Sequence, residues 1–417
     1  MDKIVIQGGK PLHGQVDISG AKNAALPVMA ATLLSAGRSR ITGLPQVRDV
    51  DTMARLVEEL GVKVIAFQDG EAVLDAATVN NHVAPYHLVS TMRASCLTLG
   101  PLLCRLGRAR VSLPGGCAIG ARPIDQHIKG LVAMGADIKI ENGYIIGQAS
   151  KLKGAHIYFD MATVTGTMNI MMAAVLAEGE TILENVAKEP EVAFLADTLN
   201  QSGARIKGAG TDTIVVQGVA AIDPIKCHIF PDRIETATYM IAAAITQGDI
   251  EIRNCVPAHV ESISLKLIES GAEVEEGETS IKVRGRHPVL PVSVKTQTYP
   301  GFPTDVQAQL MALMCISGGK SVIVENIFEN RFMHASELNR MGADIQVEGR
   351  TAIVAGVNKL SGAPVMATDL RASASLVLAG LVADGETTIS RVYHIDRGYQ
   401  NMEEKLSKLG ASIRRVK

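Results

Sequence analysis

The 417-residue sequence has no tryptophan, 3% aromatic residues and a formal net charge of −2. Base-stacking platforms need aromatic side chains, and binding to nucleic acids or membrane surfaces favours a strong positive charge, so we expect neither partner. No apolar run is long enough to cross a bilayer, and the first residues, MDKIVIQGG, lack a signal-peptide core. The six cysteines form neither CxxC pairs nor zinc spacings, which predicts reduced thiols, no metal site and a cytoplasmic location.

The sequence does contain an internal repeat. Gly-Ala or Gly-Val, followed shortly by a β-branched residue, recurs six times at spacings of 68 to 74 residues, at Gly61, Gly135, Gly203, Gly271, Gly342 and Gly410. A second series of glycines precedes the first, and each of its members separates an Ala/Leu-rich helical pattern from an alternating strand. Glycine suits the left-handed position after a helix. The pattern predicts an α/β fold of six βαβαββ-type repeats.

The two ends of the chain complement each other. The sixth repeat stops at Lys417 without its last strands, and the first residues resemble residues 351–373. We therefore expect the N-terminal strands to complete the sixth repeat. Three repeats would form a first lobe, residues 21–229, and three a second lobe, residues 1–20 plus 230–417. Two chain crossings predict lobes that can close on a ligand.

Basic residues recur where the repeats predict helix starts. Helix N-termini expose N–H groups and carry partial positive charge, so cations beside them favour binding of phosphate and carboxylate groups. A single arginine at a helix start is usually a solvated side chain, but repetition at equivalent positions predicts an anion site. The candidates are Lys22, Arg93, Arg122, Arg331, Arg371 and Arg397.

Two residues stand apart from this pattern. Asp305, in FPTDVQ, replaces the Lys or Arg of four other repeats, so it is expected to be ionised and either accept a substrate proton or serve as a cap or ion-pair partner. Cys117 lies in the glycine-rich stretch SLPGGCAIGARPIDQH, with Arg122 beyond it. A nearby cation favours the thiolate, which predicts a reactive thiol. Neither GxxxxGK[ST] nor GxGxxG after a first strand occurs, which disfavours a dinucleotide fold.

Longer stretches, among them SGAKNAALP, PGGCAIGARPIDQH, FPTDVQAQ and TDLRASASLVLAG, resemble the UDP-N-acetylglucosamine 1-carboxyvinyltransferase family of enolpyruvyl transferases. The resemblance runs along the whole chain. It implies an inside-out α/β barrel of two lobes with three repeats each. It also implies transfer of the enolpyruvyl group of phosphoenolpyruvate to the 3′-hydroxyl of UDP-N-acetylglucosamine, the first committed step of bacterial peptidoglycan synthesis. No metal or organic cofactor is implied.

The resemblance also assigns roles to residues. Cys117 would protonate C3 of phosphoenolpyruvate and carry a covalent adduct, which predicts sensitivity to fosfomycin-type epoxides, and Asp305 would act as base. The phosphate and carboxylate would be held by Lys22, Asn23, Arg122 and Arg397, with Lys22 and Arg397 also counted as catalytic. The remaining substrate contacts would be Arg93, Pro123, Ile124, Asp125, Gln126, Met161, Ala162, Thr163, Val164, Ile327, Arg331 and Arg371.

Two alternatives stay open. The sister enzyme that forms enolpyruvylshikimate phosphate has an SKS-like motif where this chain has AKNA, and a noncatalytic nucleotide-sugar-binding protein would not need Cys117, Lys22 or Asp305.

The motif ATVTGT at 162–167 differs from the commoner serine-containing form, so its side-chain contacts are less defined than its backbone contacts. We expect small-molecule substrates and a monomer.

Overall fold

The computed structural model describes residues 2–113 and 124–417, and the chain divides into two compact units. The first unit comprises the described residues from 20 to 230, and the second unit comprises residues 2–19 and 231–417. Each unit has its own buried apolar core. Among the described residues, no helix is both long and apolar enough to span a membrane.

The first unit contains three four-stranded sheets, ordered β14-β3-β5-β4, β6-β7-β9-β8 and β10-β11-β13-β12. Its strands are β3 (Arg38–Thr42), β4 (Lys63–Gln68), β5 (Glu71–Asp75), β6 (Val83–Ala84), β7 (Arg108–Ser112), β8 (Asp137–Glu141), β9 (Tyr144–Gln148), β10 (His156–Tyr158), β11 (Glu180–Glu184), β12 (Arg205–Lys207), β13 (Thr213–Gln217) and β14 (Lys226–His228). Its helices are α1 (Lys22–Ala31), α2 (Arg48–Glu59), α3 (Tyr86–Val89), α4 (Leu99–Leu106), α5 (Asp125–Ala133), α6 (Val164–Val175) and α7 (Pro190–Gln201), with 3₁₀ turns η1 (Thr32–Leu34) and η2 (Arg93–Thr98).

The second unit also contains three four-stranded sheets, ordered β16-β17-β15-β2, β18-β19-β21-β20 and β22-β23-β1-β24. Its strands are β1 (Lys3–Gln7), β2 (His13–Asp17), β15 (Asp249–Arg253), β16 (Glu273–Glu276), β17 (Ser280–Arg284), β18 (Val294–Lys295), β19 (Lys320–Val324), β20 (Asp344–Glu348), β21 (Thr351–Ala355), β22 (Pro364–Met366), β23 (Glu386–Ser390) and β24 (Ser412–Val416). Its helices are α8 (Arg233–Ile245), α9 (Glu261–Glu269), α10 (Gln307–Met314), α11 (Met333–Arg340), α12 (Ala372–Val382) and α13 (Met402–Lys408), with 3₁₀ turns η3 (Pro257–His259), η4 (Thr304–Val306) and η5 (Val392–Arg397).

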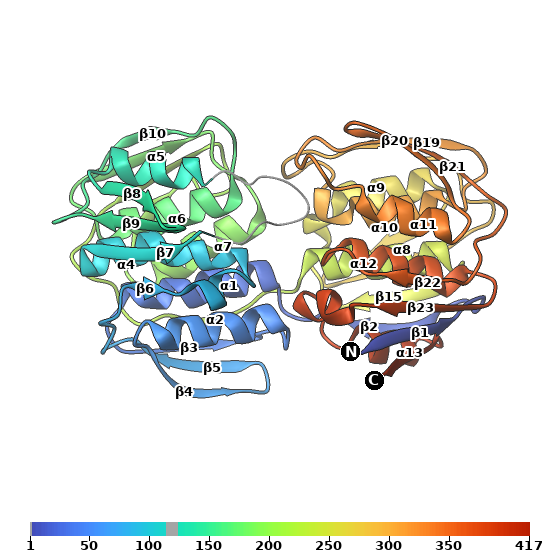
Figure 1. The fold of residues 1–417 in the computed structure, drawn as a ribbon, viewed down its shortest axis with the longest axis horizontal. Coiled ribbons are helices and arrows are strands. Elements are labelled where there is room, and N and C mark those ends of the chain that lie inside the picture. Colours follow the sequence, from blue (N-terminus) through green and yellow to red (C-terminus); the bar gives the residue numbers. More distant parts are fainter. Residues whose placement is uncertain (1, 114–123) are drawn as a thin grey trace. The chain divides into compact units, whose positions relative to one another are not determined.

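The six sheets share one architecture, which confirms the predicted βαβαββ repeats. In each sheet one edge strand pairs in parallel with its neighbour, as β10 does with β11, and the remaining pairs are antiparallel, as in β11 with β13. The first helix of a repeat is the more deeply buried one, because it is apolar on nearly all sides. In the second unit α8, α10 and α12 contact one another inside the sheets, so the helices form the core and the sheets surround them (Figure 1).

The repeated glycines end the second helix of each repeat. All six adopt a positive φ, between 89° and 100°, as the left-handed position after a helix requires. A side chain with a Cβ is strained in that conformation, so the Gly-Ala and Gly-Val phrases mark true helix ends. The residues that follow enter the edge strands β4, β8, β12, β16, β20 and β24.

The two N-terminal strands belong to different sheets, which corrects the expectation that both complete the sixth repeat. Strand β1 lies between β23 and β24, whereas β2 pairs with β15 of the fourth repeat. The likeness to residues 351–373 is still meaningful, since β21 and β22 likewise end one sheet and begin the next. In each repeat the chain leaves one sheet and enters the next at this point. The two similar segments, residues 1–20 and 351–373, therefore each contribute strands to two sheets.

Candidate active site

Lys22 opens helix α1, as the basic pattern predicted, and Asn23 follows it. Lys22 is 6% exposed, and its Nζ donates a hydrogen bond to Oδ2 of Asp49 at 3.2 Å. Asp49 lies in the first turn of α2, so one ion pair joins the first turns of both helices of this repeat. Asp49 was missed by the sequence reasoning, although its place beside Arg48 at a predicted helix start could have drawn attention to it.

Three further predicted stretches also lie at helix starts in the first unit. Arg93 begins η2, which runs directly into α4. Ile124 is the N-cap of α5, and Asp125 is its first residue. Thr163 is the N-cap of α6, and its hydroxyl accepts a hydrogen bond from the Gly166 N–H at 3.3 Å. Thr163 of the ATVTGT motif therefore has a defined role as a helix cap.

Gln126 links two of these stretches. Its Nε2 donates to Oδ2 of Asp160 at 3.1 Å, and its Oε1 accepts from the Asp160 N–H at 3.0 Å. Asp160 directly precedes the predicted contacts Met161 and Ala162, of which Met161 is 51% exposed. The side chain of Gln126 is buried and does not face solvent. Its two hydrogen bonds with Asp160 fix the position of the segment 160–164.

In the second unit, Asp305 lies in η4 between two guanidinium groups. Its Oδ1 accepts from Nη2 of Arg331 at 2.8 Å, and its Oδ2 accepts from Nε of Arg371 at 3.2 Å. The two arginine side chains are 5% and 2% exposed, whereas that of Asp305 is 27% exposed. Asp305 is thus an ion-pair partner, one of the two alternatives that the sequence left open. Two cations favour the ionised carboxylate, which is the form that a proton acceptor requires.

Glu325 is a buried carboxylate that the sequence reasoning missed. Its Oε1 accepts hydrogen bonds from the Ile327 N–H at 2.8 Å and from the Thr296 hydroxyl at 2.9 Å. Its Oε2 accepts from the Thr304 hydroxyl at 2.8 Å, and Thr304 precedes Asp305. The residue therefore fixes the predicted contact Ile327 and the loop that carries Asp305. A glutamate directly after the apolar strand β19 was the available signal.

Arg397 is the last residue of η5 and precedes α13, the second helix of the sixth repeat. The neighbouring Asp396 forms two hydrogen bonds with Arg415 on β24, at 2.6 and 3.1 Å. These bonds attach η5 to the sheet. Cys117, Arg122 and Pro123 lie outside the described residues, so their predicted roles stay predictions.

The predicted residues that are described form two groups. One group, in the first unit, consists of Lys22, Asn23, Arg93, Ile124, Asp125, Gln126, Met161, Ala162, Thr163 and Val164. The other, in the second unit, consists of Asp305, Ile327, Arg331, Arg371 and Arg397. Both groups contain basic side chains at or near helix starts, a residue type and a position suited to recognition of phosphate and carboxylate groups.

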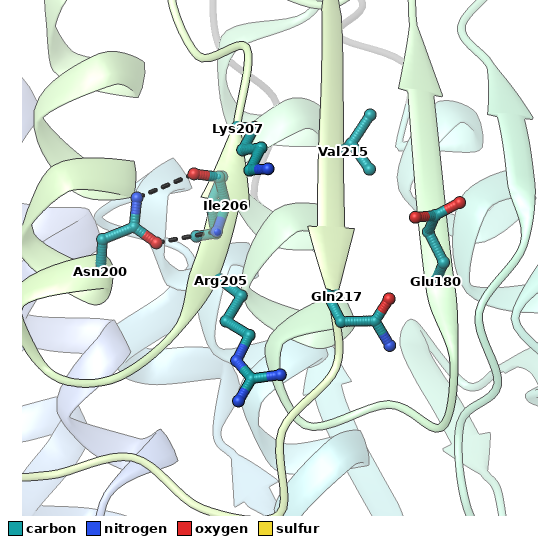
Figure 2. Close-up of a pocket in the computed structure, with 7 residues that line it drawn as sticks. All are labelled: Glu180, Asn200, Arg205, Ile206, Lys207, Val215 and Gln217. Atoms are coloured by element: carbon teal, nitrogen blue, oxygen red, sulfur yellow. Dashed lines mark hydrogen bonds between the residues drawn. The ribbon is translucent and has the colours of Figure 1, made fainter.

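A separate shallow pocket lies over β12 and β13 in the first unit (Figure 2). It is lined by Glu180, Asn200, Arg205, Ile206, Lys207, Val215 and Gln217. None of the predicted site residues lines it. The pocket lies beside the edge strand β12, and we assign it no role in catalysis.

The described cysteines are all free thiols. Burial raises the pKa of Cys104, Cys227 and Cys315 to about 12 and that of Cys255 to about 11. These thiols stay protonated at neutral pH and have little nucleophilic character. No group of three or more His, Cys, Asp or Glu side chains suited to a metal ion occurs in the part of the chain that the structure describes.

Comparison with known proteins identifies the family. The family profile described as EPSP synthase (3-phosphoshikimate 1-carboxyvinyltransferase) matches residues 6–406. The chain belongs to this family of enolpyruvyl transferases. Within the family, it is 59% identical to the UDP-N-acetylglucosamine 1-carboxyvinyltransferase of Desulfosudis oleivorans and 58% identical to that of Geobacter metallireducens. Both alignments cover 100% of this chain and of the relative.

Solved structures agree on the fold. The enolpyruvyl transferase NikO from Streptomyces tendae superposes with a TM-score of 0.88 at 24% identity, covering 100% of this chain and 99% of NikO. EPSP synthase from Acinetobacter baumannii gives 0.77 at 19% identity, covering both chains fully. The two-lobed architecture with six repeats is therefore that of the enolpyruvyl transferases, as the sequence predicted.

Proposed function

We propose that this enzyme transfers the enolpyruvyl group of phosphoenolpyruvate to the 3′-hydroxyl of UDP-N-acetylglucosamine and releases phosphate. The observation that carries the proposal is the 56–59% identity, over the whole chain, to six enzymes named UDP-N-acetylglucosamine 1-carboxyvinyltransferase. The product of that reaction enters peptidoglycan synthesis. A cytoplasmic, monomeric enzyme is part of the same proposal.

The chemistry is an addition followed by an elimination. C3 of phosphoenolpyruvate takes up a proton, the sugar oxygen forms a bond to C2, and the hydroxyl proton passes to a base. The resulting tetrahedral ketal then loses a proton from C3, while the bond from C2 to the phosphate oxygen breaks and phosphate leaves with the bonding electrons. An acid, a base and several cations are sufficient for these steps.

We assign the base to Asp305 and the acid to Cys117. Contacts with Arg331 and Arg371 support the first role, because they hold the Asp305 carboxylate in one orientation and in its ionised form. Lys22, Arg122 and Arg397 would bind the phosphate and carboxylate of phosphoenolpyruvate, together with Asn23. The charges of these side chains are suited to neutralising the leaving phosphate.

The nucleotide sugar would contact the first-unit stretches that start at Arg93, Ile124 and Met161. Backbone N–H groups at the start of α6 and of α5 are suited to a diphosphate, since helix N-termini carry partial positive charge. Ile327, fixed by Glu325, and Asp305 would add contacts from the second unit.

Phosphate release tests the proposal. The enzyme, supplied with phosphoenolpyruvate and UDP-N-acetylglucosamine, is expected to release one phosphate per enolpyruvyl product, and Cys117→Ser is expected to lower turnover strongly. With 3-phosphoshikimate as the acceptor we expect no release. Tight binding of the nucleotide sugar without any phosphate release would instead favour the noncatalytic binding protein, and release with 3-phosphoshikimate would favour the sister reaction.

A further inference from the structure

Asn169 connects three helices in the interior of the first unit. It lies on α6, its side chain is fully buried, and its Oδ1 accepts a hydrogen bond from the backbone N–H of Gly100 on α4 at 2.8 Å. Its Nδ2 lies 2.9 Å from Nδ1 of His127 on α5. The helices pack closely at this point. A Cβ atom added to Gly100 would lie 2.5 Å from the backbone carbonyl oxygen of Asn169.

The direction of every hydrogen bond in this network follows from one fixed donor. The Gly100 N–H can only donate, so the amide oxygen of Asn169 must face it and the amide NH₂ must face His127. His127 Nδ1 is then an acceptor, and the imidazole proton lies on Nε2. Nε2 is 3.3 Å from the hydroxyl oxygen of Thr165, to which it donates. The network thus requires a neutral His127 with the proton on Nε2.

Burial supports this assignment. The His127 side chain is 3% exposed, and desolvation lowers its pKa to about 4; nearby Arg93 lowers the pKa further and Asp125 opposes the shift. A neutral ring at physiological pH can accept from Asn169 and donate to Thr165 at the same time.

Each of the three helices joined at Asn169 begins at a stretch predicted to contact the nucleotide sugar. Helix α4 continues η2, which opens with Arg93; α5 opens with Asp125; and α6 opens with Val164. His127 is two residues beyond Asp125, and Thr165 directly follows Val164. The Gln126–Asp160 pair adds a second link between the starts of α5 and α6. A displacement at Asn169 would therefore move the three stretches relative to one another.

We propose that Asn169 is a positioning residue for the nucleotide-sugar substrate, holding the helix starts that carry Arg93, Asp125 and Val164 in one arrangement through Gly100 and His127. The inference rests on the proposed function, since it names part of the machinery for the same acceptor substrate. Asn169 itself is buried and touches no substrate; it acts through its neighbours.

The test compares substitutions that break or keep the network. Asn169→Leu removes both hydrogen bonds, so we expect KM for UDP-N-acetylglucosamine to rise about tenfold or more while kcat and KM for phosphoenolpyruvate stay within about threefold. Asn169→Asp keeps the acceptor for Gly100 and can pair with a doubly protonated His127, so it is expected to restore most of the affinity. The ¹⁵N chemical shifts of His127 report the Nε2–H tautomer in the wild type and an imidazolium in Asn169→Asp.

Asn200 provides a matched control in the same unit. Its amide also makes two hydrogen bonds, with the N–H and the carbonyl oxygen of Ile206 at 2.8 and 2.9 Å, as Figure 2 shows. Asn200→Leu also removes two hydrogen bonds of a side-chain amide. Asn200 lies on α7, which is not one of the three helices joined at Asn169. It is expected to lower the free energy of unfolding without changing KM for the nucleotide sugar.

The outcomes separate this inference from the proposed function. Wild-type enzyme that releases no phosphate overturns the proposed function, whatever the variants do. Active wild type with equal KM in Asn169→Leu and Asn200→Leu overturns the role of Asn169. Should Asn169→Leu fail to fold, Thr165→Val removes the partner of His127 Nε2 and must raise KM for the nucleotide sugar. An Nδ1–H tautomer of His127 in the wild type contradicts the network directly.

Discussion

At the scale of single residues, the second unit concentrates charge in a small buried volume. Asp305 forms ion pairs with Arg331 and Arg371, and both guanidinium groups are almost inaccessible to solvent. Removing one partner of a buried ion pair leaves the other charge uncompensated, at a cost of about 3–5 kcal/mol. The same carboxylate therefore contributes to the stability of the second unit and, in our proposal, to catalysis.

Asp305→Asn tests the catalytic contribution. The amide keeps the size of the side chain but is a very weak base, so we expect kcat to fall by about 10²–10⁴-fold, the usual range for loss of a general base. KM for UDP-N-acetylglucosamine is expected to change only a few-fold. Steady-state kinetics at several pH values measures both constants. An unchanged kcat with a raised KM would make Asp305 a residue that positions the substrate.

His334 makes the stability of the enzyme depend on pH. It is fully buried, neither ring nitrogen has a hydrogen-bond partner among the described residues, and burial lowers its pKa from 6.5 to about 4. Asp369 opposes this shift, and Arg331 adds to it. Between pH 6.5 and 4 the unfolded chain binds a proton at this position that the folded chain does not bind. Stability is therefore lost as the pH falls through this window, by up to about 3 kcal/mol.

His334→Phe is expected to remove this part of the pH dependence, since phenylalanine fills a similar volume and no described hydrogen bond is lost. Urea unfolding at pH 7, 6 and 5 gives the free energies of unfolding. The wild type should lose more stability than the variant on going from pH 7 to pH 5. The pKa of His127 is also lowered to about 4, so the stability of the variant should still depend on pH to some extent. Equal losses in both proteins would contradict the assignment.

At the scale of elements, β1 decides whether the last sheet can form. It lies between β23 and β24, and Ile4 and Ile6 are fully buried on its inner face. Without β1, both neighbouring strands would expose their hydrogen-bonding edges. The first residues of the chain thus complete a sheet whose other strands lie between Pro364 and Val416.

Ile6→Ala is expected to destabilise the second unit by about 2–5 kcal/mol, the usual cost of deleting a buried isoleucine side chain beyond Cβ. Gln7→Ala, on the same strand but exposed, is the control and should change stability by less than about 0.5 kcal/mol. Denaturant unfolding followed by circular dichroism measures both. A cost for Ile6→Ala no greater than that for Gln7→Ala would mean that β1 does not support this core.

At the scale of the whole molecule, the division of sheets suggests two lobes that fold independently. The sheets of the first unit are formed only by strands between Arg38 and His228, whereas those of the second unit combine β1 and β2 with strands after residue 248. Strand β14 occupies in the first unit the place that β2 occupies in the second. We propose that residues 20–230 and residues 1–19 plus 231–417 are the two lobes.

Separate production of the pieces tests this proposal. Residues 20–230 are expected to fold alone, with a cooperative unfolding transition. Residues 231–417 lack β1 and β2 and are not expected to fold, whereas a permuted chain that joins residues 1–19 after Lys417 through a short glycine linker should fold. Lys3 on β1 pairs with Val416 on β24, which permits such a link. Cooperative folding of residues 231–417 without β1 and β2 would refute the division.

Much of this organisation was predictable because it rests on local signals. A glycine with positive φ after a helix is dictated by the backbone geometry of a few neighbouring residues, and basic residues that recur at equivalent positions can be read from the sequence directly. The repeat made these signals visible several times, so the fold class and the helix starts at Lys22 and Arg93 could be predicted from the sequence. Motif resemblance then supplied the candidate chemistry.

Other features depend on residues that are distant in the chain. That β2 joins the fourth repeat, that Asp305 pairs with Arg371, and that Asn169 meets both Gly100 and His127 are results of packing between separate elements. Sequence periodicity shows which residues are buried, but it does not show which buried groups become partners. Hydrogen bonds and ion pairs have short range, so the partners are chosen when the chain folds.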